Sequence, residues 1–240
     1  IGTDGPDLDA RIDNWPAGVF FRSEPADVGG GQLHHRSIFF PPSASFSSGD
    51  LMLAFGTGER TDLKYEGVPG YDENNRFYVM RDPHPLGPGA IPSVAYDESD
   101  LTNIDGIATD PDPTDLGFTL SADDGEKFIT SPITFAGYVL VASYSPGSDL
   151  GDPCSTAAGS AFLYLLDLGT GAGFFGPAPG VTHEGRRLSL GSGVPAEPRM
   201  SVSEDGSSTI FVRTSTGAIT MTDGPALPKR VGLVYWKQDM

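Results

Sequence analysis

Short apolar runs, each closed by turn-forming residues, are the feature that most constrains how this chain can fold. The runs consist of β-branched, aromatic and aliphatic residues and end at Gly, Pro, Asp or Ser. The chain also carries 32 glycines and 21 prolines among 240 residues, and both are unfavourable inside helices. The pattern predicts an all-β fold with strands near residues 18–22, 36–40, 50–57, 76–81, 126–134, 138–144, 161–167, 186–190, 195–201, 208–214, 218–222 and 231–237.

A repeated order of strands indicates a β-propeller within the all-β class. In three successive sets, a strand leads into a more apolar strand and then into a strand that ends near Asp. The apolar strands read LMLAFG at 51–56, YVLVASY at 138–144 and TIFVR at 209–213. Four antiparallel strands joined by Asp-Gly or Thr-Gly turns are typical of a propeller blade.

We therefore predict a partial β-propeller of about three four-stranded antiparallel blades plus one leading outer strand. The blades would span roughly residues 34–125, 126–192 and 193–240, and residues 1–33 would end a preceding blade. Three blades do not close a ring, since propellers typically have about four to eight. The remaining blades are expected upstream, in a longer polypeptide, or in another chain.

The charge balance excludes several classes of partner. The chain has 32 acidic and 15 basic residues, a formal net charge of −17, which repels phosphate backbones and anionic lipids. No apolar run approaches the roughly 18 residues of a membrane span, and no signal-peptide pattern opens the chain. We expect no nucleic-acid binding and no membrane insertion.

Long polar connectors interrupt the repeat at residues 61–75, 83–120 and 146–159. Loops of this length in compact domains are usually functional, so partner contacts are expected there. The lone Cys154 leaves two interpretations open, a half-buried thiol or a disulfide to a segment outside these residues.

Candidate metal ligands lie in the acidic, proline-rich middle connector. Asp110, Asp112 and Asp115 are closely spaced carboxylates of the kind that bind calcium. The Gly and terminal bidentate acid of an EF-type loop are missing, and Pro111 and Pro113 stiffen the backbone. A solvated acidic loop is the favoured interpretation, so no cofactor is expected, with calcium at these three residues as the alternative.

No catalytic constellation emerges from the sequence. Residues 121–128, SADDGEKF, approximate the Asp-box of sialidase-type propellers, which is a structural turn. The few scattered arginines do not suggest a sialidase arginine triad, and the histidines lack zinc-ligand spacing. A quinoprotein-like dehydrogenase would need a repeated tryptophan pattern, whereas the chain has 2 Trp. We expect no enzymatic activity.

Four stretches in a fixed order resemble the C-terminal propeller of the type IV pilus tip-adhesin family, the PilY/PilC type. They are LMLAFGTGER with NRFYVMRD, then DGEKFITSP, then GDPCSTAAGSAFLYLLDLGTG, and finally GVPAEP with the closing VYWK. The resemblance covers roughly residues 51–237. The motif positions it identifies as structural are Gly56, Thr57, Gly58, Asp152, Pro153, Cys154, Asp167, Thr170, Gly171 and Trp236.

The resemblance implies a non-enzymatic, extracellular protein at the pilus tip, secreted through the periplasm. Its expected roles are pilus assembly and retraction, twitching motility and adhesion. Its expected partners are minor pilins, the upstream part of its own chain and a surface or host receptor. The family's calcium loop has no clear counterpart in these residues. The alternative function is a structural propeller module of another surface filament or envelope complex.

Overall fold

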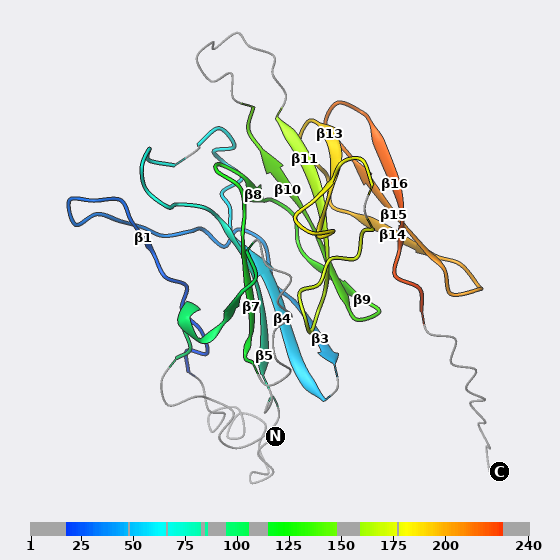
Figure 1. Ribbon diagram of the computed structural model, residues 1–240, viewed down its shortest axis with the longest axis horizontal. Coiled ribbons are helices and arrows are strands. Elements are labelled where there is room, and N and C mark those ends of the chain that lie inside the picture. The colour runs from blue at the N-terminus through cyan, green and yellow to red at the C-terminus, as the bar shows by residue number, and fades with distance from the viewer. Residues whose placement is uncertain are drawn as a thin grey trace, which may run out of the picture.

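The all-β prediction is confirmed in the computed structural model, which describes residues 18–47, 49–65, 67–82, 85, 95–105, 115–147, 159–176 and 178–227. Their regular structure consists of strands and one 3-10 helix, η1 (Glu98–Asp100). The strands form three sheets that lie side by side across the molecule, and none of them closes on itself (Figure 1). No helix in the described part of the chain is long and apolar enough to cross a membrane.

The first sheet has five strands in the order β3-β4-β5-β7-β6. Their neighbours are antiparallel except for β6, which runs parallel to β7. The bounds are β3 (Ser43–Ser47), β4 (Asp50–Gly56), β5 (Arg76–Asp82), β6 (Thr102–Asn103) and β7 (Gly117–Ser121). A small hairpin of β1 (Ala26–Asp27) and β2 (Leu33–His34) projects beside this sheet (Figure 1).

The second sheet has six strands in the order β12-β13-β11-β10-β8, with β9 also paired to β10. Its strands are β8 (Lys127–Phe128), β9 (Ile133–Phe135), β10 (Tyr138–Ser145), β11 (Ser160–Asp167), β12 (Val181–Thr182) and β13 (Arg187–Ser192). The third sheet contains β14 (Arg199–Val202), β15 (Ser208–Arg213) and β16 (Ile219–Gly224) in sequence order. The limits predicted for the blades stay a prediction.

Two apolar layers join the three sheets face to face. Because side chains alternate along a strand, β10 and β11 supply both layers. Val141 and Tyr164 face the first sheet and pack with its Phe77 and Phe118. On the opposite face, buried side chains of the second sheet pack with Ile210 and Val212 of β15; they are Leu140, Leu163, Leu165 and Leu190.

A third cluster covers much of the other face of the first sheet. It contains Phe55, Tyr78 and Met80, and Leu101 packs on it from the end of η1. Phe20 and Phe21 add to it from the segment before β1, where Phe21 forms an isolated bridge with Tyr96. This segment is the one predicted as a leading strand at 18–22.

Two details of the sequence-based prediction are wrong. Residues 36–40 form no strand, and the Ser-rich β3 pairs with β4 instead. The reason is that Arg36 is anchored by the carbonyls of Glu24 and Asn74, while Pro41 and Pro42 lack the N–H of a central strand.

The second error is the 83–120 connector, which contains β7. Its first residue, Gly117, has φ of +133°, and a Cβ there would lie 1.9 Å from the carbonyl oxygen of Val79. The strand therefore begins at a position that only glycine fits. It was not predicted because the residues before it are acidic and rich in proline.

Truncating Leu163 in β11 tests how the second and third sheets pack. We expect Leu163→Ala to lower the free energy of unfolding by about 2–5 kcal/mol, because a cavity would remain at a fully buried site. Leu33→Ala removes the same atoms from a side chain that is 55% exposed. It should change the free energy of unfolding by less than about 0.5 kcal/mol. Urea unfolding of the 240-residue chain measures both, and equal effects would contradict this packing.

Candidate functional site

The motif residues Gly56, Thr57 and Gly58 lie where the first sheet meets the start of the second. A Cβ on Gly56 would lie 2.5 Å from the Cβ of Phe128, and Gly58 has φ of +147°. Thr57 is fully buried, and its carbonyl accepts a hydrogen bond of 3.1 Å from the Phe128 N–H. The two glycines thus allow β8 to approach the end of β4, so this motif acts in packing.

The motif residues Asp167, Thr170 and Gly171 form the turn after β11. One oxygen of Asp167, Oδ1, accepts hydrogen bonds from the backbone N–H groups of Gly169 and Thr170 and from the Thr170 hydroxyl, at 2.8–3.0 Å. Gly171 has φ of +68° and donates its N–H to the Asp167 carbonyl. This is an Asx-type turn, and its polar groups satisfy one another.

Several predicted site residues lie outside the described residues: Asp110, Asp112, Asp152, Pro153, Cys154 and Trp236. Asp115 is described, and its Oδ2 accepts a hydrogen bond of 2.6 Å from the Thr102 hydroxyl. The described residues contain no group of three or more His, Cys, Asp or Glu side chains that could hold a metal ion. Calcium binding at the acidic connector stays a prediction.

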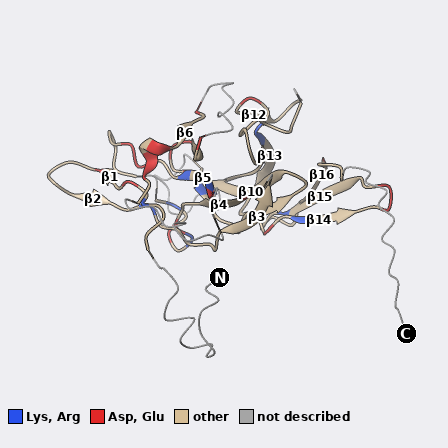
Figure 2. Ribbon diagram, turned by 90° about the horizontal axis from the view of Figure 1, so that it is seen from below, with Lys and Arg blue, Asp and Glu red and all other residues tan. Residues whose placement is uncertain are grey.

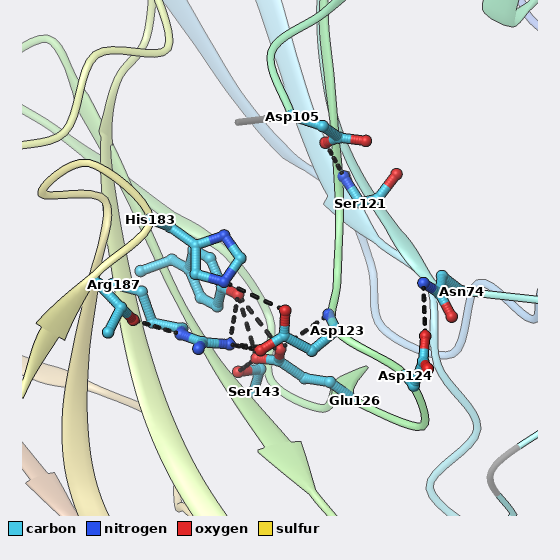
Figure 3. Close-up of polar contacts among 11 residues, drawn as sticks. Asn74, Asp105, Ser121, Asp123, Asp124, Glu126, Ser143, His183 and Arg187 are labelled. Atoms are coloured by element: carbon cyan, nitrogen blue, oxygen red, sulfur yellow. Dashed lines mark hydrogen bonds and ion pairs between the residues drawn. The ribbon is translucent and has the colours of Figure 1, made fainter. Parts of the chain in front are cut away.

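A buried charge cluster lies between the turn at 121–128 and β13 (Figure 3). Glu126 is fully buried, and its Oε2 lies 2.8 Å from Nη1 of Arg187. The same Nη1 lies 2.7 Å from Oδ2 of Asp123, whose Oδ1 lies 3.2 Å from Nε2 of His183. The Arg187 guanidinium also stacks over Phe162 at 4.1 Å from the ring centroid.

Hydroxyl donors complete the cluster around Glu126. The Ser143 hydroxyl donates to Oε1, and the Tyr164 hydroxyl lies 3.2 Å from the same oxygen. Burial, followed by the nearby Glu126 carboxylate, raises the pKa of Tyr164 well above its usual 10.0. Burial lowers the pKa of Arg187, but Tyr164 and Glu126 outweigh it and leave a net increase. The Tyr164 hydroxyl and the Arg187 guanidinium therefore both keep their protons at neutral pH.

The turn that carries Glu126 is also tied to the first sheet. The Asn74 side-chain amide donates to Asp124 at 3.2 Å (Figure 3), and the Asn75 side-chain amide donates to the Glu126 carbonyl at 2.8 Å. Both oxygens of Glu126 have protein partners. The cluster forms an internal clamp that holds the turn between β7 and β8 against β13 of the second sheet.

A second polar cluster lines a pocket beside the β1–β2 hairpin. Nδ1 of His34 lies 2.8 Å from Oε2 of Glu73, and the Tyr65 hydroxyl donates to the same oxygen at 2.9 Å. Lys127 is buried against the pocket and donates to the Gly125 carbonyl at 3.0 Å. The cavity is about 80 Å³, well below the roughly 300 Å³ at which ligand pockets begin. The contacts of Glu73 with His34 join the β1–β2 hairpin to the 61–75 connector.

Sequence reasoning identified the turn at 121–128 but missed the role of its glutamate. Glu126 and Arg187 are 61 residues apart, and the pairing of strands within the second sheet brings them together. A local signal does exist, because Glu126 directly precedes the strand residues Lys127 and Phe128. The His34–Glu73 pair joins β2 to the 61–75 connector and has no comparable signal.

Neutralising Glu126 tests the clamp. Glu126→Gln is expected to lower the free energy of unfolding by about 1–3 kcal/mol, because Arg187 would lose its buried charge partner and keep only the half-exposed Asp123. Glu204→Gln makes the same change at an exposed position and should have an effect within about 0.5 kcal/mol. Denaturant unfolding compares them. Equal midpoints for Glu126→Gln and the unaltered chain would rule the clamp out.

The pocket predicts an acid-sensitive contribution to stability. Burial raises the pKa of Glu73, but hydrogen bonds from His34, Val68 and Tyr65 together bring it below its usual 4.5. A carboxylate with a lowered pKa stabilises the fold above its unfolded-state pKa, and this contribution disappears as pH falls through the folded-state pKa. Glu73→Gln should therefore destabilise the chain at about pH 7 but barely at about pH 3.

Unfolding midpoints across this pH range measure the effect of Glu73→Gln. Glu59→Gln is the matched control, because Glu59 lines the same pocket and is exposed. A stability difference for Glu73→Gln that does not change with pH would contradict the assignment.

Comparisons with known proteins bear on the fold. No family model and no curated protein matches the sequence. Among solved structures, the crystal structure of the Pseudomonas aeruginosa PilY1 C-terminal domain is similar, with a TM-score of 0.50 and 17% sequence identity. The alignment covers 84% of this chain and 48% of the solved one, so the chain spans about half the length of the domain it matches. The chain therefore has the fold of the PilY1 C-terminal domain, as a partial β-propeller-like stack of open sheets.

Proposed function

We propose that this chain belongs to a non-enzymatic, extracellular subunit at the tip of type IV pili. There it supports pilus assembly and retraction, twitching motility and adhesion to surfaces or host cells. The observation that carries this proposal is the fold shared with the PilY1 C-terminal domain. The ordered motifs that resemble the PilY/PilC type support it independently.

The proposed mechanism is mechanical and interfacial. Stacked sheets joined by apolar layers form a stiff body, and the buried Glu126–Arg187 pair holds the turn between the first two sheets in place. Connectors at the ends of the strands contact partners, and the 61–75 connector is held in place by the Glu73 contacts with His34 and Tyr65. Minor pilins and the upstream part of the same polypeptide bind the body, while a surface or host receptor binds the connectors.

The structural role of the two described carboxylate clusters supports the non-enzymatic part of the proposal. The Glu126 and Glu73 carboxylates both accept several hydrogen bonds from the protein itself. The pocket at Glu73 is too small for a drug-sized or sugar-sized ligand. These carboxylates hold separate segments of the chain together through hydrogen bonds.

A pull-down from sheared cell-surface material, followed by mass spectrometry, tests the proposal. We expect co-purification with major and minor pilins, because a tip subunit detaches with the filament. Recovery from the same fraction without any pilin, or with the components of another filament, would contradict the pilus-tip role. A tagged, unrelated surface protein from the same cells is the control for carry-over.

Deletion of the encoding gene separates the two parts of the proposed role. Loss of surface pili would assign the subunit to assembly, whereas normal pili with reduced attachment would assign it to adhesion. Normal pili, attachment and twitching together would contradict the proposal. Re-expression of the deleted protein should restore whichever property is lost.

A further inference from the structure

The β1–β2 hairpin is an arm that stands apart from the three sheets. It pairs with no other strand of the described chain, and Figures 1 and 2 show it projecting from the end of the stack opposite to β14, β15 and β16. Its tip consists of Gly29, Gly30 and Gly31, with φ between 62° and 83°, a conformation that glycine adopts readily. A two-stranded hairpin is marginally stable alone, so its position depends on contacts with the rest of the chain.

The 61–75 connector supplies contacts at two points along the hairpin. Tyr71 packs on the tip, where a Cβ on Gly29 would lie 2.2 Å from the Tyr71 hydroxyl oxygen. Nearer the base, the Tyr65 hydroxyl lies 3.3 Å from Nδ1 of His34, and both groups contact Glu73. The two tyrosines therefore have fixed positions along the hairpin.

These two tyrosines are ordered but stay exposed. Tyr65 is 43% and Tyr71 46% exposed, and neither is part of the three apolar clusters of the described chain. Ordered, exposed tyrosines suit recognition, because they offer a large rigid contact area at a low entropic cost. We call His34, Tyr65 and Tyr71 the hairpin surface.

Exposed charges beside the hairpin surface are mainly acidic. The hairpin contributes Asp27 and the connector contributes Asp62 and Asp72, against Lys64 of the connector. Lysine and arginine side chains pair with carboxylates and also stack on the faces of tyrosine rings. Carboxylates beside exposed rings therefore complement a partner that carries these basic side chains.

The geometry points to an extended, basic protein segment as the ligand of the hairpin surface. Such a segment lies along the arm, with its lysine or arginine side chains on the Tyr65 and Tyr71 rings and their charges near Asp62 and Asp72. Identifying the partner as a neighbouring pilus subunit rests on the proposed function, whereas the surface and its chemistry do not. The contact lies in the 61–75 connector, where the sequence predicts one.

Fluorescence anisotropy tests this inference with the full-length protein and a labelled decapeptide of alternating lysine and glycine. We expect binding that weakens as salt rises from about 0.05 M to about 0.5 M. Tyr71→Ala should weaken binding about two- to fivefold, through loss of an exposed cation–π contact. Tyr71→Phe keeps the ring and should bind like the unaltered protein. A decapeptide of alternating glutamate and glycine should not bind.

Matched controls separate the hairpin surface from the general negative charge of the protein. Leu33 is also exposed, but strand alternation places it on the opposite side of β2 from His34, so Leu33→Ala should not change binding. Asp62→Asn keeps the acceptor of the Tyr65 N–H and should weaken binding about twofold. Glu204→Gln removes one charge in the third sheet's turn and should have a smaller effect.

Three results would overturn the inference. The first is no binding of the basic peptide at up to about 1 mM. The second is binding that is unchanged in both Tyr71→Ala and Tyr65→Ala, with circular dichroism verifying that each variant is folded. The third is binding of a neutral hexasaccharide such as maltohexaose but not of the basic peptide, which would assign the tyrosines to a sugar.

The peptide assay contains no pilus component, so its outcome is independent of the pull-down described above. Tyrosine-dependent peptide binding without recovery of pilins would contradict the pilus-tip role and leave the hairpin surface supported. Recovery of pilins without peptide binding would contradict the hairpin surface and leave the pilus-tip role supported.

Discussion

The buried pair of Glu126 and Arg187 fixes the turn that connects the first sheet to the second, and the position of that turn sets how β8 enters the second sheet. A carboxylate without solvent contact is stable only if its charge is matched and its oxygens are hydrogen-bonded. Arg187 from β13, Ser143 from β10 and Tyr164 from β11 meet these needs. The same turn accepts a hydrogen bond from Asn74 of the first sheet's side, so the charge pair holds on the second sheet a turn that the first sheet also contacts.

Close backbone approach is the second constraint, and it requires glycine at three positions. At Gly56, Gly58 and Gly117 a Cβ would lie within 3 Å of neighbouring atoms. These positions let β8 approach the end of β4 and let β7 approach β5.

Strands were predicted correctly where long apolar runs occur. They were predicted wrongly where side-chain contacts, prolines or an acidic neighbouring stretch determine the backbone. The runs at β4, β5, β10, β11 and β15 are apolar enough that any sheet would bury them, and their positions were predicted. Residues 36–40 are equally apolar but lie outside the sheets, because Arg36 and two prolines hold the backbone away. β7 was missed because it follows an acidic, proline-rich stretch.

The all-β class and the repeated order of strands follow from the sequence alone, since short apolar runs and turn residues are local properties. Which buried acid meets which arginine was decided only by the tertiary structure, because Glu126 and Arg187 are 61 residues apart and meet across the strands of the second sheet. The hairpin surface likewise exists only after folding. The contact between His34 and Glu73 that positions it joins residues 39 apart, and no local pattern could connect them.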